Sequence, residues 1–136
     1  MEFQIAENIG TMKKPRIMIV EDEKHLAMIM KEVLINFGYD CCKLFTSGEE
    51  AVSNMEQEKP DIILMDINLD GEMDGIDTAN KIRSDFGVPI IFLTAHEEKE
   101  IRELAEIIEP AGYFIKPVAG EILKSAIDKI ILSKKS

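Results

Sequence analysis

Four short apolar runs in this chain each end at side chains that can take part in chemistry. In chain order, the runs are followed by Glu21 and Asp22, by Asp66, by Thr94 and by Lys116. If the runs are neighbouring parallel strands, these side chains gather at one edge of a sheet. Open α/β sheets bind their ligands at that carboxyl-terminal edge. The spacing therefore predicts a single site.

The residue types of this expected site indicate metal-assisted phosphoryl transfer. The carboxylates of Glu21, Asp22 and Asp66 would repel one another in one crevice. A hard divalent cation relieves that repulsion, and Mg²⁺ fits best because it needs few carboxylates and keeps water or phosphate oxygens as ligands. Lys116 can pair with Asp66 or with a phosphoryl group, and Thr94 can donate to an anionic oxygen. Asp66, central in the expected strand order, is then the natural acceptor.

Apolar runs and helical stripes alternate along the chain. The expected strands cover residues 16–20, 39–45, 61–65, 89–93 and 112–115. Five strands alternating with five helices predict an α/β fold with a parallel sheet covered by helices on both faces. Right-handed crossovers favour the flavodoxin-like strand order 2-1-3-4-5.

Caps and apolar spacing place the helices between the strands. Gly38 is expected to end the first helix, and Ser47, with Glu50 three residues later, to begin the second. A later helix begins near Glu97. Its inward residues are expected to be Ile101, Leu104, Ala105 and Ile108.

Length and composition set the class of protein. The chain has 136 residues, enough for one domain, which we place at 14–133 between a leader or cloning remnant at 1–13 and a tail at 134–136. The net charge of −10 argues against direct binding of nucleic acid. No run is long enough for a membrane span and no signal peptide begins the chain, so a cytoplasmic location is expected. The adjacent Cys41 and Cys42 would point to opposite sheet faces as reduced thiols.

From about Lys14 to Ser133 the chain resembles the receiver domain of two-component response regulators, such as the chemotaxis regulators. The motifs that carry the resemblance are Ile-Val-Glu-Asp-Glu at 19–23, Ile-Leu-Met-Asp-Ile at 63–67, Met-Asp-Gly-Ile at 73–76, Leu-Thr-Ala at 93–95 and Gly-Tyr-Phe-Ile-Lys-Pro at 112–117.

The resemblance implies a role for each site residue. Asp66 would accept a phosphoryl group from a phosphohistidine on a sensor histidine kinase or phosphotransfer protein. Thr94 and Lys116 would contact the phosphoryl oxygens, and Tyr113 would turn inward on activation as an aromatic switch. The implied Mg²⁺ ligands are Asp22, Asp66 and the backbone carbonyl of Asn68, with Glu21 acting through water.

The resemblance also implies partners. The switching surface would comprise the helix that begins near Glu97, the strand at 112–115 and the last helix. It would bind an output partner, and homodimerisation is open. The Lys116–Pro117 bond is expected to be cis. Such a protein assists its own phosphorylation and dephosphorylation but is not otherwise an enzyme.

The loop after Asp66 departs from the family pattern and leaves an alternative open. Residues 68–75 read Asn-Leu-Asp-Gly-Glu-Met-Asp-Gly, which is one residue longer than usual and lacks the usual proline. The same loop matches the opening of a calcium-binding EF-hand, with Asp70 and Asp77 as further ligands. The alternative is therefore a receiver-like or EF-hand-like metal-binding interaction module without phosphotransfer. His96, two residues after Thr94, could overhang the phosphoryl group and tune its lifetime.

Overall fold

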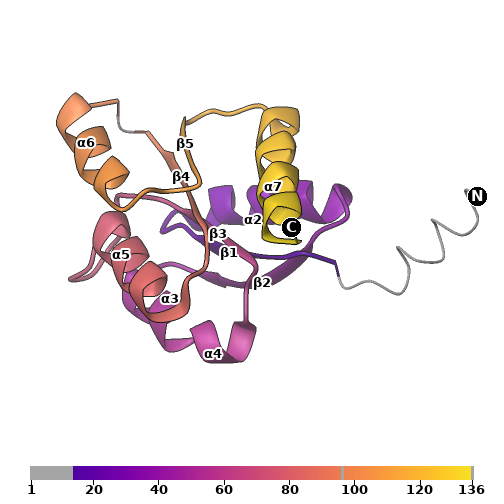
Figure 1. Cartoon of the computed structure of the whole chain (residues 1–136), viewed down its shortest axis with the longest axis horizontal. Helices are drawn as coiled ribbons and strands as arrows, with labels where there is room; N and C mark the ends of the chain where they lie inside the picture. Colours follow the sequence, from indigo (N-terminus) through magenta and orange to yellow (C-terminus); the bar gives the residue numbers. More distant parts are fainter. Residues whose placement is uncertain (1–13, 96, 136) are drawn as a thin grey trace, which may run out of the picture.

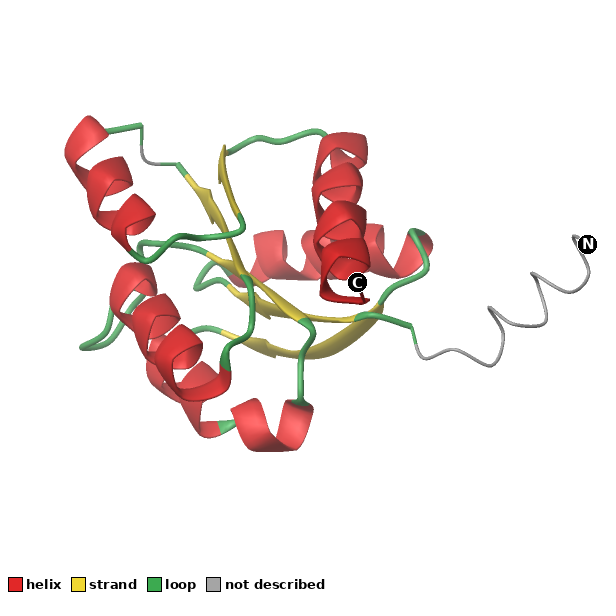
Figure 2. Ribbon diagram, in the orientation of Figure 1, coloured by secondary structure: helices red, strands yellow, loops and turns green. Residues whose placement is uncertain are grey.

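A five-stranded parallel sheet runs through the centre of the protein (Figures 1 and 2). The computed structural model describes residues 14–95 and 97–135, so the segment at 1–13 and His96 lie outside the described residues. The strands are β1 (Arg16–Val20), β2 (Asp40–Phe45), β3 (Ile62–Met65), β4 (Ile90–Thr94) and β5 (Gly112–Ile115). Their order is β2-β1-β3-β4-β5, which confirms the expected topology.

Helices cover both faces of this sheet, as Figure 1 shows. The described helices are α2 (Lys24–Asn36), α3 (Gly48–Ser53), α4 (Met55–Glu58), α5 (Gly75–Phe86), α6 (Lys99–Ile107) and α7 (Gly120–Lys135). Helices α2 and α7 pack on one face, and α3 to α6 pack on the other. None of the described helices has the length and apolar character needed to cross a membrane.

Each central strand feeds two separate hydrophobic cores, because successive side chains point to opposite faces of a sheet. In β3, Ile63 and Met65 join the core under α3 to α6, whereas Ile62 and Leu64 join the core under α2 and α7. All four side chains are buried. Burial on both faces explains why this strand is continuously apolar in the sequence.

The helix caps expected from the sequence are present. The Ser47 hydroxyl accepts a hydrogen bond from the Glu50 amide at 3.3 Å, and Gly38 has a φ of 96° directly after the last turn of α2. The prediction of a single helix between β2 and β3 is wrong. Asn54, with φ −107° and ψ 5°, leaves helical geometry and divides this segment into α3 and α4.

The prediction of which α6 residues face the core is also partly wrong. Ala105 is buried and Ile101 and Ile108 pack against the core, but the Leu104 side chain is 56% exposed. Helix α6 covers the β4–β5 end of the sheet, where only a narrow stripe of the helix meets the core. Leu104 lies beside that stripe and therefore remains in contact with solvent.

Helix α5 begins directly against the chain that follows β3. The Gly75 amide donates to the Ile67 carbonyl at 2.7 Å, and a Cβ added at Gly75 would collide with the backbone carbonyl of Asp66. At the other end of α5, the Arg83 guanidinium donates to the carbonyls of Ile108 and Glu109 just after α6. Both ends of α5 are thereby fixed relative to the sheet.

Candidate functional site

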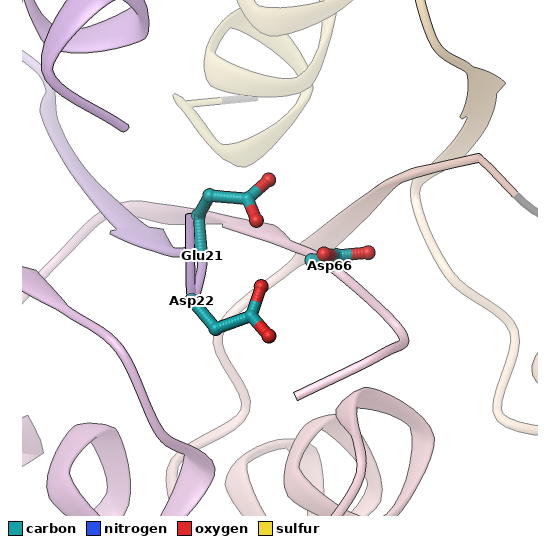
Figure 3. A group of neighbouring side chains, drawn as sticks. All are labelled: Glu21, Asp22 and Asp66. Atoms are coloured by element: carbon teal, nitrogen blue, oxygen red, sulfur yellow. The ribbon is translucent and has the colours of Figure 1, made fainter. Parts of the chain in front are cut away.

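The strand register brings the acidic residues together at the carboxyl-terminal edge of the sheet. Val20 at the end of β1 pairs with Met65 at the end of β3, so the residues that follow, Glu21 and Asp66, lie level with each other. The Asp66 amide also donates to the Val20 carbonyl at 3.0 Å. Figure 3 shows Glu21 and Asp22 on the chain leaving β1, beside Asp66.

The three side chains form one compact acidic cluster. Carboxylate oxygens of Glu21, Asp22 and Asp66 all lie within 4.8 Å of one another. Glu21 is 2% exposed and Asp66 is 7% exposed, while Asp22 is partly buried. Burial, the neighbouring Glu21 and the charge of Asp70 together raise the pKa of the Asp22 carboxyl. The cluster therefore holds more negative charge than its surroundings favour.

Lys116 approaches this cluster from the end of β5. Its Nζ lies 3.6 Å from Asp66 Oδ2, which is the pairing that the sequence analysis anticipated. The same ammonium makes a closer ion pair with Glu21 Oε1, which sequence reasoning missed. No spacing in the sequence distinguishes the two carboxylates as partners, since both follow neighbouring strands.

Thr94 lies fully buried at the end of β4, next to the strand that carries Lys116. The Lys116 amide donates to the Thr94 carbonyl at 2.9 Å, which fixes the two residues across adjacent strands. The Lys116–Pro117 peptide bond that follows is cis, as expected. Thr94 and Lys116 therefore reach the same edge as Asp66.

Tyr113 is part of β5 and lies half-buried beside the core. Its ring centroid is 6.0 Å from that of Phe92, and the Arg102 guanidinium carbon lies 5.0 Å from the Tyr113 centroid. Burial raises the pKa of the Tyr113 hydroxyl; the charge of Arg102 opposes this rise, and neighbouring glutamates add to it. The ring thus links β4 to α6 in the described conformation.

The loop between β3 and α5 completes the edge. The Asn68 amide donates to Asp66 Oδ1 at 3.4 Å, so the loop begins beside the acceptor carboxylate. Further along, the Met73 amide donates to Glu49 Oε1 of α3 at 2.8 Å. Glu49 was not singled out from the sequence, because a glutamate in the first turn of a helix is common for reasons of helix stability alone.

The donor set fits a magnesium ion. Its protein oxygens are carboxylates, the hard ligands that Mg²⁺ prefers, and two of the three are nearly fully buried. Among the ion pairs of the described residues, those of Lys116 compensate part of this charge. The EF-hand alternative is not favoured, because Asp66 follows strand β3, whereas an EF-hand loop follows a helix.

Comparison with known families and proteins agrees with this geometry. Residues 17–128 match the family described as the response regulator receiver domain. The transcriptional regulatory protein PdtaR of Mycobacterium tuberculosis is 35% identical over 113 residues, which cover 83% of this chain and 55% of that protein. The chain thus spans about half the length of the curated relatives it matches.

Solved structures show the same fold. The signal receiver domain of a modulated diguanylate cyclase from Desulfovibrio desulfuricans G20 is 38% identical, with a TM-score of 0.86, covering 90% of this chain and 98% of that one. A two-component response regulator from Clostridium difficile is 28% identical, with a TM-score of 0.83, covering 90% of this chain and all of the other. The chain belongs to the receiver domain family of two-component response regulators.

Proposed function

We propose that Asp66 is the phosphoacceptor of this receiver domain and that a phosphohistidine of a sensor histidine kinase or phosphotransfer protein is the donor. The observation that carries the proposal is the position of the Asp66 carboxylate, 7% exposed among two further carboxylates and 3.6 Å from the Lys116 ammonium. Such a carboxylate lies beside a cation at the end of a buried strand, so it is positioned as a nucleophile must be.

In the proposed reaction an Asp66 carboxylate oxygen attacks the phosphorus of the phosphohistidine. The new O–P bond forms as the P–N bond breaks, and the electron pair of that bond remains on the imidazole nitrogen. Lys116 and Thr94 would receive the phosphoryl oxygens, since both lie at the ends of the adjacent strands. Positioning and charge neutralisation provide most of the rate in such transfers.

The residues that would hold Mg²⁺ are Asp22, Asp66 and the Asn68 backbone carbonyl, with Glu21 one water molecule away. When bound, the ion would neutralise charge on the acceptor and on the incoming phosphoryl oxygens. The buried acidic cluster supports this assignment, because its three carboxylates carry more negative charge than the Lys116 ammonium beside them balances.

The proposed output is a change in partner binding at the surface made by α6, β5 and α7. Movement of Thr94 and Lys116 toward the phosphoryl group would shift the loop after β4, and Tyr113 would follow inward. Leu104 and Ile107 of α6 and Ile122 of α7 are more than half exposed on this surface, which supports a role in protein contact. A cytoplasmic location and formation of a homodimer belong to the same proposal.

Intact mass spectrometry tests the assignment of Asp66. Incubation with acetyl phosphate and Mg²⁺ is expected to add the mass of one phosphoryl group to the protein. Asp66→Asn should abolish this gain, because an amide oxygen is not an adequate nucleophile.

Asp77→Asn is the matched control, since Asp77 is exposed on α5 and is also the last ligand of the alternative calcium site. It should take up phosphate like the wild type. Phosphate uptake that survives Asp66→Asn, or none in the wild type, would refute the proposed acceptor. Calcium binding that depends on Asp70 and Asp77 would favour the EF-hand-like module.

A further inference from the structure

The loop at residues 68–74 is the part of the site where this chain departs from the family pattern. Residues from outside the loop hold it in place. Its first amide, that of Asn68, points to Asp66 Oδ1, and Asp70 forms an isolated parallel bridge with Ser47. The loop ends at Asp74, whose side chain caps α5 by accepting from the Asp77 amide at 2.8 Å. Between these ends, the loop makes a further contact with a neighbouring helix.

That contact comes from Glu49 in the first turn of α3. Glu49 Oε1 accepts a hydrogen bond from the Met73 amide at 2.8 Å, across a separation of 24 residues. The side chain is partly buried rather than extended into water. A carboxylate that accepts a backbone amide makes one of the stronger hydrogen bonds available to a protein loop.

The second carboxylate oxygen of Glu49 lies against Gly71. A Cβ added at Gly71 would lie only 2.5 Å from Glu49 Oε2, and Gly71 has a φ of 105°, which side chains rarely adopt. The absence of a side chain therefore lets the loop pass directly over the carboxylate. Both oxygens of Glu49 consequently face the loop, one at residue 71 and one at residue 73.

We propose that Glu49 is a positioning residue for metal binding, which holds the 68–74 loop so that the Asn68 carbonyl faces the acidic cluster. This inference shares one assumption with the proposed function, namely that the Asn68 carbonyl is a Mg²⁺ ligand. Glu49 would touch neither the metal nor the phosphoryl group. It would act by reducing the conformational freedom that the loop loses when the metal binds.

Two pairs of variants separate the hydrogen bond from the charge. Glu49→Ala removes the acceptor and the charge, whereas Glu49→Gln removes the charge and keeps an oxygen acceptor for the Met73 amide. Glu50→Ala and Glu50→Gln are matched controls, because Glu50 lies in the same turn but bonds Ser47 and Thr46 instead of the loop. All four variants change the net charge equally.

Calorimetric titration with Mg²⁺ gives the first readout. We expect Glu49→Ala to raise the Mg²⁺ dissociation constant about tenfold, equivalent to a loss of ~1.4 kcal/mol in binding free energy. Glu49→Gln should stay within about twofold of Glu50→Gln, since the remaining oxygen rescues the contact. Hydrogen exchange of the Met73 amide should be faster in Glu49→Ala than in the other three variants.

Phosphorylation by acetyl phosphate gives the second readout. In Glu49→Ala the Mg²⁺ concentration for half-maximal rate should rise, while the rate at saturating Mg²⁺ returns close to that of the wild type. A melting temperature lowered in EDTA with an unchanged Mg²⁺ affinity would overturn the proposal, because Glu49 would then be structural only. Equal Met73 exchange in all variants would also overturn it.

These outcomes remain distinct from failure of the proposed function. If no protein takes up phosphate but Glu49→Ala alone weakens Mg²⁺ binding, the acceptor assignment fails and the positioning role stands. If the wild type is phosphorylated on Asp66 and Glu49→Ala binds Mg²⁺ like Glu50→Ala, only the positioning role fails.

Discussion

At the scale of single residues, Lys116 is the cation of the site and lies between two carboxylates. Its ammonium pairs closely with Glu21 and lies 3.6 Å from Asp66 Oδ2. The Glu21 side chain is only 3% exposed, so it depends on this pair for compensation of its charge. A phosphoryl group on Asp66 would therefore compete with Glu21 for the same ammonium.

Replacement of Lys116 by methionine should separate these effects. We expect Lys116→Met to lower the free energy of unfolding in EDTA by about 1–3 kcal/mol, since it leaves two buried carboxylates without their cation. Added Mg²⁺ should recover more stability in the variant than in the wild type, because the ion no longer competes with an ammonium. Urea unfolding with and without Mg²⁺ measures both quantities.

Lys81→Met is the control for this comparison. Lys81 makes an exposed pair with Asp85 at 3.2 Å on α5. Its loss should change stability by less than about 0.5 kcal/mol and leave the Mg²⁺ effect unaltered. Equal behaviour of the two variants would contradict the proposed role of Lys116 in charge compensation.

At the scale of elements, a polar contact ties the start of β2 to α7. The Tyr39 hydroxyl and the Lys124 ammonium both donate to the Asp128 carboxylate. Burial favours the neutral carboxyl, but the hydrogen bonds from Lys124 and Tyr39 outweigh it and lower the pKa of Asp128. The contact complements the hydrophobic packing of α7, where Leu123 and Ile127 enter the core.

The lowered pKa of Asp128 gives a pH dependence with a definite sign. A carboxyl whose pKa is lower in the folded state stabilises the protein above its unfolded pKa, and this contribution is lost as the pH falls through the folded pKa. Wild type should thus exceed Asp128→Asn in stability near pH 7, by less than about 1 kcal/mol because the group is 43% exposed. The difference should shrink as the pH falls below about 3.9, the ordinary pKa of an aspartate, and vanish in stronger acid.

Urea unfolding at a series of pH values measures this difference. Asp85→Asn is a suitable control, since Asp85 is similarly exposed and pairs with a lysine four residues away, as Asp128 does. Its effect should be smaller at every pH. A difference for Asp128→Asn that persists unchanged in acid would show that packing, rather than charge, causes it.

The sequence predicted the sheet better than the helices. Strands such as β3 are buried on both faces, so their apolar residues are continuous and their ends are marked by the site residues. Helix α6 meets the core along a narrow stripe, and an apolar side chain such as Leu104 can lie beside that stripe. Periodicity alone does not show how wide the contact is, which is why the expected burial of Leu104 was wrong.

The site was predictable to the extent that it follows the ends of strands. Register alone places Glu21 level with Asp66 and Lys116 directly after the residue paired with Thr94. The Glu21–Lys116 pair depends on side-chain conformation, and the contact of Glu49 with Met73 joins residues from separate loops and helices. Neither follows from strand order, so neither could be derived before the structure.

At the scale of the whole molecule, the net charge of −10 should make stability depend on cations. Salt screens the mutual repulsion of surface carboxylates, so the melting temperature should rise with NaCl. MgCl₂ at equal ionic strength should raise it further, because binding to the folded state alone adds about 1.4 kcal/mol at tenfold excess over the dissociation constant.

The excess effect of MgCl₂ should require the acidic cluster. Asp22→Asn combined with Asp66→Asn is expected to remove it and to leave the response to NaCl in place. Differential scanning calorimetry in the two salts measures the contrast. An excess effect that survives in the double variant would place the bound ion elsewhere on the protein.

The contact between Gly75 and the carbonyl of Asp66 bears on how such a chain can change over generations. The obstacle to a side chain at this position is backbone, which has no rotamer by which to yield. Substitutions in the loop before Gly75 do not meet this backbone, whereas a side chain at residue 75 would have to displace the backbone between strand and helix. In the Met-Asp-Gly-Ile motif, the smallest residue is therefore the hardest one to replace.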